Sequence, residues 1–280
     1  MKLLRHGPKG QEKPGLVDAG GQVRDLSAHL DDIAGEALTP EGLARIAAID
    51  PAALPLVAPG TRIGACVGRV GKFIGIGLNY ADHAAEAGMD IPSEPIVFSK
   101  FTSCIAGPND VVEIPPGSAK TDWEVELGIV IGRGGRDISE RDALSHVAGY
   151  CVVNDISERE WQAERGGSWD KGKGFDGFGP IGPWLVTRDE VPDPQRLAMW
   201  LEVDGTRRQD GTTATMIFGV RTLVAYLSRC MSLQPGDVIA TGTPPGVGMG
   251  MKPPVYLAGG EVMRLGIEGL GVQEQKVRRR

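Results

Sequence analysis

The sequence of 280 residues predicts a strand-dominated α+β fold, and three observations support this prediction. Short β-type runs separated by turn signals recur from residue 72 onward. The few helical stretches do not alternate with these runs in the regular order of a βαβ fold. The 41 glycines and 20 prolines supply many turns without an internal repeat or low-complexity tract. The recurrence of short β-type runs in the later part of the sequence predicts two domains. These are a small N-terminal α/β domain, residues 1–68, and a larger domain, residues 69–280.

The N-terminal domain is expected to combine short strands with one helix. A strand is predicted in LLRHG, residues 3–7, and a hairpin with a glycine turn in GLVDAGGQVRDLS, residues 15–27. A helix is predicted in TPEGLARIAAI, residues 39–49, because Thr39 can cap it and a proline suits the first helical position. The stretch at 51–71 is rich in Pro and Gly and is expected to be an irregular linker.

The larger domain is expected to consist mainly of strands. The β-type runs are FIGIGL (73–78), PIVFSK (95–100), VVEI (111–114), VELGIVIG (125–132), AGYCVVNDIS (148–157), GPWLVT (182–187) and LAMWLEVDG (197–205). The helical stretches are NYADHAAEAG (79–88), SEREWQAER (157–165) and GVRTLVAYLSRCM (219–231). The third of these has apolar residues at helical spacing. This mixture favours an α+β fold over a doubly wound one.

Composition and charge argue against several classes of protein. The formal net charge is −6 and no basic patch is interleaved with aromatic residues, so we expect no nucleic-acid partner. The last residues, KVRRR, are expected to form a solvated tail. No apolar run approaches the ~18 residues that span a membrane, and MKLLRHGPKG lacks the apolar part of a secretory signal. Four scattered cysteines argue against a disulfide scaffold, so we expect a cytoplasmic protein with no membrane association.

Two glutamates stand at alternate positions in the otherwise apolar stretch TDWEVELG, residues 121–128. In a strand, Glu124 and Glu126 share one face about 6–7 Å apart, and they repel each other unless a positive charge lies between them. A solvated outer face is the ordinary explanation for such a pair. However, the strand continues into apolar LGIVIG, and Asp155 ends another apolar run. Carboxylates from separate strands are ligands that Mg²⁺ or Ca²⁺ prefers, whereas zinc prefers His or Cys.

Six blocks of the sequence resemble the fumarylacetoacetate hydrolase family. In chain order they are GLNYADHAAEAG (77–88), FSKFTSCIAGPNDVV (98–112), DWEVELGIVIG (122–132), GYCVVNDISEREWQ (149–162), KGFDGFGPIGPW (173–184) and LQPGDVIATGTPPGVG (233–248). Within this family the chain looks closest to the bacterial sugar-acid branch, which includes 2,4-diketo-3-deoxy-L-rhamnonate and fuconate hydrolases. The resemblance implies a mixed β-roll catalytic domain at 69–280, a small N-terminal appendage, and a homodimer or higher homo-oligomer.

The resemblance also implies roles for eleven residues. These are Glu124, Glu126 and Asp155 as ligands of Mg²⁺ (or Mn²⁺, with Ca²⁺ possible), His83, Glu86 and Lys173 as catalytic residues, and Tyr80, Lys100, Arg159, Gln162 and Thr243 as substrate-binding residues. His83 and Glu86 are three positions apart, which makes them neighbours on a helix. A carboxylate beside a histidine orients the ring and raises its basicity. Gly75, Gly77 and Gly88 bracket this segment and suit one that moves on ligand binding.

Several of these residues also have simpler explanations. A lone histidine on an Ala-rich helix is usually exposed. Lys173 stands among glycines, where a lysine is usually solvated, and Lys171 is an alternative two positions away. Arg159 could pair with the neighbouring Glu158, and glutamines such as Gln162 are common at surfaces. The loop TGTPPGVG could be only a turn, although Gly and Pro let backbone amides approach a carboxylate closely.

The activity implied by the resemblance is hydrolysis of a carbon–carbon bond in a ketonic substrate. The expected substrate is 2,4-diketo-3-deoxy-L-rhamnonate or a similar small 2,4-diketo acid. Its products would be pyruvate and a hydroxy acid such as lactate, in sugar-acid catabolism. His83, oriented by Glu86, would act as general base for water, and Lys173 would stabilise developing negative charge. The alternatives are an acylpyruvate hydrolase, a decarboxylase or lyase of oxaloacetate or ureidoglycolate type, and a non-catalytic protein stabilised by a metal.

Overall fold

The computed structural model describes residues 1–88 and 90–280, and most of its regular structure is β-sheet. The strands are β1 (Lys2–His6), β2 (Lys13–Val17), β3 (Val23–Asp25), β4 (Phe73–Gly77), β5 (Ile96–Lys100), β6 (Ile105–Ala106), β7 (Val112–Ile114), β8 (Thr121–Asp122), β9 (Val125–Ile131), β10 (Val147–Asn154), β11 (Ser157–Glu158), β12 (Gly179–Thr187), β13 (Ala198–Val203), β14 (Thr206–Thr212), β15 (Val238–Ala240), β16 (Val262–Ile267) and β17 (Gly271–Arg279).

Helices are few and short. The α-helices are α1 (Pro40–Ala47), α2 (Ala81–Ala87), α3 (Trp169–Lys173) and α4 (Val220–Cys230). Turns of 3₁₀-helix are η1 (Gly35–Leu38), η2 (Pro51–Ala53), η3 (Thr102–Cys104), η4 (Ala143–His146), η6 (Arg188–Glu190), η7 (Thr213–Thr215) and η8 (Gly248–Gly250), and η5 (Glu160–Glu164) is a π-helical turn. Within residues 1–88 and 90–280, every helix is too short or too polar to span a bilayer.

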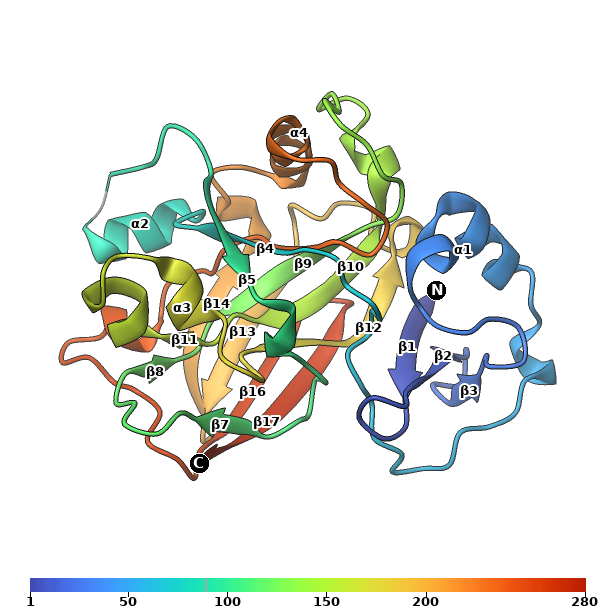
Figure 1. Cartoon of the computed structure of the whole chain (residues 1–280), viewed down its shortest axis with the longest axis horizontal. Coiled ribbons are helices and arrows are strands. Elements are labelled where there is room, and N and C mark those ends of the chain that lie inside the picture. Colours follow the sequence, from blue (N-terminus) through green and yellow to red (C-terminus); the bar gives the residue numbers. More distant parts are fainter. Residues whose placement is uncertain (89) are drawn as a thin grey trace.

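Three sheets make up the fold, and their content confirms the predicted strand-dominated α+β class. A ten-stranded mixed sheet has the order β3-β2-β1-β12-β10-β9-β15-β4-β5, with β6 paired to β12. A five-stranded sheet has the order β14-β13-β16-β17-β7, and β11 and β8 form a small ladder. Figure 1 shows that strands distant in the sequence lie side by side in each sheet, as β17 does with β7.

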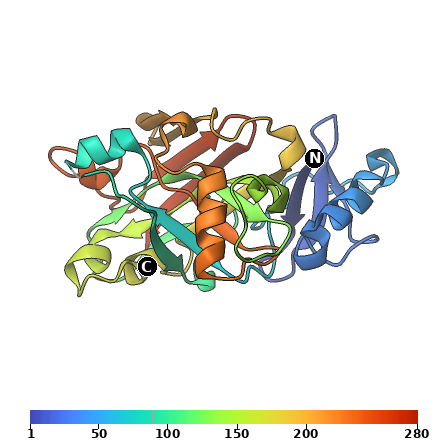
Figure 2. The same ribbon diagram turned by 90° about the horizontal axis from the view of Figure 1, so that it is seen from above.

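The core is centred on β9 and β10. Both strands are buried along their whole length, because each face of the large sheet is covered. On one face β13 and β16 contact β9, and β16 also contacts β10. On the other face α4 lies across the sheet (Figure 2) and buries Leu223, Val224 and Leu227. Such double coverage explains why these two strands read as nearly continuous apolar runs.

The N-terminal residues contain the predicted strands and helix. The two hairpins β1-β2 and β2-β3 form as antiparallel pairs. Helix α1 begins after Thr39, whose Oγ1 accepts a hydrogen bond from Gly42 N at 3.1 Å. β1 also pairs with β12, so the large sheet continues from the N-terminal residues into the rest of the chain. The stretch at 51–71 is irregular, as predicted, but it packs into the core, where Cys66 and Val67 are buried.

Two further details differ from the sequence predictions. The helix predicted at 157–165 is reduced to η5, because Ser157 and Glu158 instead pair with β8. The residues KVRRR do not form a solvated tail, because β17 runs through Arg279 and pairs with both β16 and β7. Long-range strand pairing decides both outcomes, and local sequence patterns do not carry that information.

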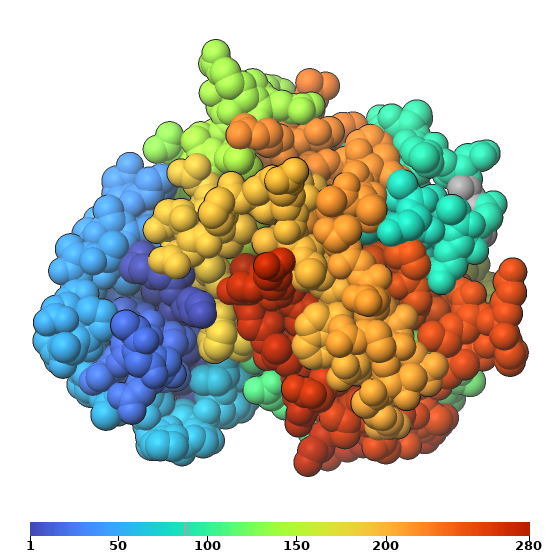
Figure 3. Space-filling model, turned by 180° about the vertical axis from the view of Figure 1, so that it is seen from behind, coloured from blue at the N-terminus to red at the C-terminus, as the bar shows by residue number. Residues whose placement is uncertain are grey.

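An arginine joins the N-terminal residues to the rest of the chain. Figure 3 shows the N-terminal residues, in blue, gathered at one end of the molecule. Arg62 donates to Asp110 through Nε at 2.8 Å and Nη2 at 2.6 Å, and to Glu12 through Nη1 at 2.9 Å. Burial opposes ionisation of Asp110, but the hydrogen bonds from Arg62 and from Gly107 N outweigh it and lower the pKa of Asp110.

We predict that Asp110→Asn destabilises the protein by about 1–3 kcal/mol at neutral pH, because it removes a charge-assisted pair of hydrogen bonds. Since the pKa of folded Asp110 lies below its ordinary value of 3.8, the stabilisation is complete above that pH and is lost as the pH falls through the lowered value. Urea unfolding should therefore show a difference between wild type and variant that shrinks below about pH 4. Asp142→Asn, which changes only exposed contacts with Arg141 and Ser139, is the control and should have little effect.

Candidate active site

Three carboxylates converge where β9 and β10 lie side by side. Glu126 is in β9, Glu124 immediately precedes it, and Asp155 immediately follows β10. The antiparallel register places Glu126 opposite Val153 and Val125 opposite Asn154, and Asp155 N donates to Glu124 O at 2.9 Å. One oxygen of each carboxylate lies within 4.8 Å of an oxygen of the other two, and all three residues are buried. This is the geometry expected of ligands to one hard cation.

Three buried cations surround the carboxylates. Lys173 Nζ lies 2.6 Å from Glu124 Oε2 and 2.8 Å from Asp155 Oδ2. Lys100 Nζ donates to Asp155 Oδ1 at 2.6 Å. Arg159 Nη2 lies 2.7 Å from Glu124 Oε1. Burial opposes ionisation of Glu124, but the charges of Lys173 and Arg159 outweigh it and lower its pKa.

Glu126 is the least compensated of the three carboxylates. Burial raises its pKa well above the ordinary value, and the negative charges of Asp155 and Glu124 raise it further. Its Oε2 accepts a hydrogen bond from Gly242 N at 2.7 Å. The cluster therefore has room for more positive charge beside Glu126.

The charge balance of the surroundings fits a divalent ion. The three carboxylates and the neighbouring Asp122 supply four negative charges, and Lys100, Arg159 and Lys173 supply three positive ones. A dication would change the balance from one negative to one positive charge, which suits an anionic substrate. The donors are all carboxylate oxygens, so Mg²⁺, Mn²⁺ or Ca²⁺ fits better than zinc.

The helix α2 brings a histidine–glutamate pair over the carboxylates. His83 Nδ1 lies 3.2 Å from Glu86 Oε2, and both residues line the same cavity as Glu124 and Glu126. Because Nδ1 faces Glu86, Nε2 is the ring nitrogen left to act in the cavity. Both carboxylate oxygens of Glu86 also lie 3.2 Å from Gly246 N, so the helix is tied to the loop opposite it.

The cavity has a volume of about 160 Å³ and is lined by both charged and apolar side chains. Its apolar walls are formed by Ile76, Leu78, Phe98, Ala163, Trp169, Val247 and Met249. The rings of Phe98 and Trp169 lie 5.6 Å apart. A Cβ at Gly75 would lie 2.2 Å from Phe98, and one at Gly77 would lie 2.3 Å from Trp169. These glycines, which the sequence suggested as hinges, therefore allow two aromatic rings to pack on β4.

Eight of the eleven residues implied by the resemblance line this cavity. They are His83, Glu86, Glu124, Glu126, Arg159, Gln162, Lys173 and Thr243. Asp155 does not line the cavity but belongs to the carboxylate cluster. Lys100 does not line it either, and it contacts Asp155. Tyr80 does not line the cavity, because it is fully buried with its hydroxyl 3.2 Å from Met199 Sδ.

The structure also separates the two lysines that the sequence left as alternatives. Lys173 is buried among the carboxylates, whereas Lys171 is only half-buried and its Nζ contacts Arg165 O. Thr243 Oγ1 donates to Val125 O at 2.9 Å and accepts from Gln209 Nε2 at 2.7 Å. The threonine hydroxyl therefore fixes its loop to β9. Because it donates its proton to Val125 O, it has no second proton to donate to a ligand.

Sequence reasoning missed several residues of the site. Asp122 is fully buried and holds Arg159 Nε at 2.9 Å. Its place two residues before Glu124 was a signal, because the same strand period extends to it. The aromatic walls Phe98 and Trp169 carried no comparable signal, since their role depends on glycines far away in the sequence.

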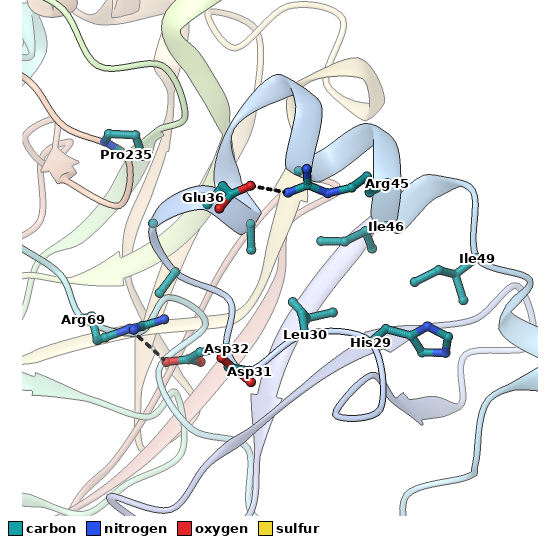
Figure 4. A pocket seen from close by; sticks show the side chains of 14 residues that line it. His29, Leu30, Asp31, Asp32, Glu36, Arg45, Ile46, Ile49, Arg69 and Pro235 are labelled. Carbon is teal, nitrogen blue, oxygen red and sulfur yellow. Dashed lines mark hydrogen bonds and ion pairs between the residues drawn. The ribbon is translucent and has the colours of Figure 1, made fainter.

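A wider groove of about 760 Å³ lies among the N-terminal residues, near Pro235 (Figure 4). Four of its charged side chains form two ion pairs within the groove. Arg45 Nη2 lies 2.7 Å from Glu36 Oε1, and Arg69 Nε lies 4.0 Å from Asp32 Oδ2. Within the described residues, the groove contains no cluster of three metal-ligating side chains. The residues suited to metal binding and catalysis therefore line the smaller cavity and not this groove.

We predict that Glu126→Gln abolishes stabilisation by Mn²⁺ and leaves the metal-free protein at least as stable as wild type at neutral pH. The neutral amide removes a ligand and also the repulsion that raises the pKa of Glu126. Thermal unfolding with and without MnCl₂ measures both effects, and at 100 times Kd the wild type should gain about 2.7 kcal/mol. Glu158→Gln changes a nearby buried carboxylate bonded to Ser118 and Thr121, and it should keep the full response to Mn²⁺. A full response in Glu126→Gln would contradict the assignment.

Comparison with known proteins identifies the family. The family description "Fumarylacetoacetate (FAA) hydrolase C-terminal" matches residues 72–278. A Burkholderia ambifaria protein with a provisional hydrolase name is 72% identical over 279 residues, which is 99% of each chain. The solved fumarylacetoacetate hydrolase of Exiguobacterium antarcticum is 37% identical, with a TM-score of 0.87 and 100% of both chains covered.

A second solved structure adds information on ligands. Maleylpyruvate hydrolase of Sphingobium sp. SYK-6, in complex with manganese(II) ion and pyruvate, is similar with a TM-score of 0.82 and 28% identity. The match covers 100% of this chain and 99% of that one. The family match spans most of the chain, and the fold and the carboxylate cluster agree with it. The chain belongs to the fumarylacetoacetate hydrolase family.

Proposed function

We propose that this protein is a metal-dependent hydrolase that cleaves a carbon–carbon bond of a 2,4-diketo acid and releases pyruvate. The observation that carries the proposal is a single cavity in which the His83–Glu86 pair faces the buried carboxylates Glu124 and Glu126. The similar maleylpyruvate hydrolase, solved with manganese and pyruvate, supports the same chemistry. The proposed family role of Asp155 as third ligand agrees with its distance from the two glutamates.

Glu124, Glu126 and Asp155 would hold the ion. When bound, a divalent ion would polarise the 2-oxo group of the substrate and offset its negative charge. Arg159 is suited to bind the substrate carboxylate. Its Nη2 is buried and, although close to two carboxylates, makes no aligned hydrogen bond with the described residues. Gln162 accepts from Arg159 Nη1 at 3.0 Å and can offer its amide nitrogen to a substrate oxygen.

His83 is the proposed general base. Its Nε2 would take a proton from water while the water oxygen bonds to C4 of the substrate. The C3–C4 bond then breaks, its electron pair stays with the three-carbon fragment, and His83 returns the proton to C3. One water is consumed, and the products are pyruvate and the carboxylic acid formed at C4. Lys173 would balance the charge on Glu124 and Asp155 as negative charge develops in the cavity.

The sequence resemblance favours a sugar-derived substrate, 2,4-diketo-3-deoxy-L-rhamnonate, which would yield lactate as second product. The walls of the cavity favour a second candidate, an acylpyruvate with an apolar acyl group. Phe98, Trp169 and Met249 offer mainly carbon surface, and the indole N–H of Trp169 is the one strong hydrogen-bond donor among these three side chains. Both candidates share the reacting diketo acid and differ only in the group attached to C4.

His83→Ala is predicted to lower kcat by about 10²–10⁴-fold, because it removes the general base. Binding of Mn²⁺ should be unchanged, since the ligands are on β9 and after β10. Pyruvate release from a panel of 2,4-diketo acids, together with calorimetric titration of Mn²⁺, measures both properties. Loss of metal binding with retained turnover would show that the assigned role is wrong.

The cavity walls lead to a prediction about substrate preference. If the acyl group contacts the apolar walls, kcat/KM should rise by about fourfold for each added methylene until the cavity is filled. Trp169→Ala should remove this dependence on chain length. Trp161→Ala is the matched control, because Trp161 packs on Phe175 at 5.6 Å and does not line the cavity. A wild-type preference for the rhamnonate-derived acid over every acylpyruvate would exclude the second candidate.

A further inference from the structure

Asp122 is a fully buried carboxylate that lies next to the carboxylate cluster without belonging to it. Its Oδ1 accepts from Gly248 N at 2.7 Å and Trp123 N at 2.9 Å. Its Oδ2 accepts from Met249 N at 3.0 Å and Arg159 Nε at 2.9 Å. Both oxygens are therefore saturated by protein donors, which suits a fixed structural contact better than a reacting group.

Two of these donors come from a loop that forms one wall of the cavity. Val247, Met249 and Gly250 line the cavity. A Cβ at Gly248 would lie 1.9 Å from Val255 O and 2.8 Å from Asp122 Oδ1. Only glycine can approach both groups this closely, so the backbone at this position is matched to Asp122.

The same loop also contacts the two other parts of the site. Gly242 N donates to Glu126, and Gly246 N faces the carboxylate of Glu86. Backbone amides at 242, 246, 248 and 249 thus reach a metal-ligand candidate, the partner of His83, and Asp122. Asp122 is the contact that joins this loop to the arginine beside the cluster.

We propose that Asp122 is a positioning residue that holds both Arg159 and the 246–249 loop in place through one carboxylate. Arg159 lies between two acids, with Nη2 2.8 Å from Asp122 Oδ2 and 2.7 Å from Glu124 Oε1. Without the charge at 122, Glu124 alone would attract the guanidinium. The amides of Gly248 and Met249 would lose their charged acceptor, because a neutral side-chain amide has one accepting oxygen where the carboxylate has two. Asp122 does not touch the substrate and acts through these two neighbours. The inference rests on the proposed function only for the part that concerns ligand binding by Arg159.

The first test measures amide hydrogen exchange of the 246–249 loop in the metal-free protein. Asp122→Asn should speed exchange in peptides that contain this loop by about tenfold or more, because charged hydrogen bonds to two amides are lost. Glu158→Gln is the matched control, since Glu158 is equally buried on the paired strand β11, and among the described residues its side chain bonds to Ser118 and Thr121 and not to the loop or to the guanidinium of Arg159. Unchanged exchange in Asp122→Asn, or an equal change in both variants, would overturn the proposed contact with the loop.

The second test measures Kd for pyruvate in the Mn²⁺-loaded protein for Asp122→Asn, Arg159→Gln and the double variant. Asp122→Asn should weaken pyruvate binding by about tenfold. Adding it to Arg159→Gln should cost at most about threefold, because its effect passes through the arginine. Full additivity would show that Asp122 does not position Arg159. A residue that is important only for stability would not produce this coupling.

A second variant keeps the proposal testable if Asp122→Asn does not fold. A backbone ester at position 249 replaces the donating N–H by oxygen and leaves every side chain in place. Exchange at 246–248 should rise several-fold in this variant, and an unchanged rate would overturn the proposal. Failure of the proposed function is a separate result. It would appear as absence of turnover for every diketo acid, while the exchange and pyruvate-binding experiments would still decide the role of Asp122.

Discussion

Burial of like charges beside one another is the constraint on which the rest of the structure depends. Glu124, Glu126 and Asp155 are buried in the interior, where an uncompensated carboxylate is costly. Lys100, Lys173 and Arg159 compensate most of this charge, and each is itself buried. The negative charge that remains uncompensated lies mainly on Glu126, whose pKa is raised. The protein thus tolerates an unfavourable arrangement in the metal-free state, as sites that bind cations commonly do.

Two buried strands position the carboxylates of the site, whereas a short helix and a loop lie over them. β9 and β10 are buried on both faces and fix the spacing of the carboxylates. The short helix α2 and the 246–249 loop lie over them and contact each other through Glu86 and Gly246. This division would let the covering elements change without altering the spacing of the carboxylates. Substrate preference would then depend on the cover and on the aromatic pair Phe98 and Trp169, which pack on β4.

The sequence was most informative where one local rule decides the outcome. Side chains alternate along a β-strand, which indicated that Glu124 and Glu126 point to the same side, and both line the cavity. The cap at Thr39 correctly marked the start of α1. It was least informative where distant segments decide. Pairing of β11 with β8 shortened the helix expected at 157–165, and pairing of β17 with β7 ordered the residues KVRRR. The contact between Arg159 and Asp122 is another outcome that distant segments decide. Asp122 shares the strand period of the glutamates, but the period indicates a face and not a contact.

The pairing of β17 has a consequence for how the polypeptide is made. Gln273 donates to Val152 O, and Gln275 donates to Pro108 O, so the last strand completes hydrogen bonds with segments made much earlier. Asn154, next to Asp155, donates to Gln275 Oε1 at 3.0 Å. A nascent chain on the ribosome therefore has β10 without this cover until residues 262–279 have left the exit tunnel. Newly made molecules would expose apolar strands during that interval, so chaperone contact would be most useful before residues 262–279 are available.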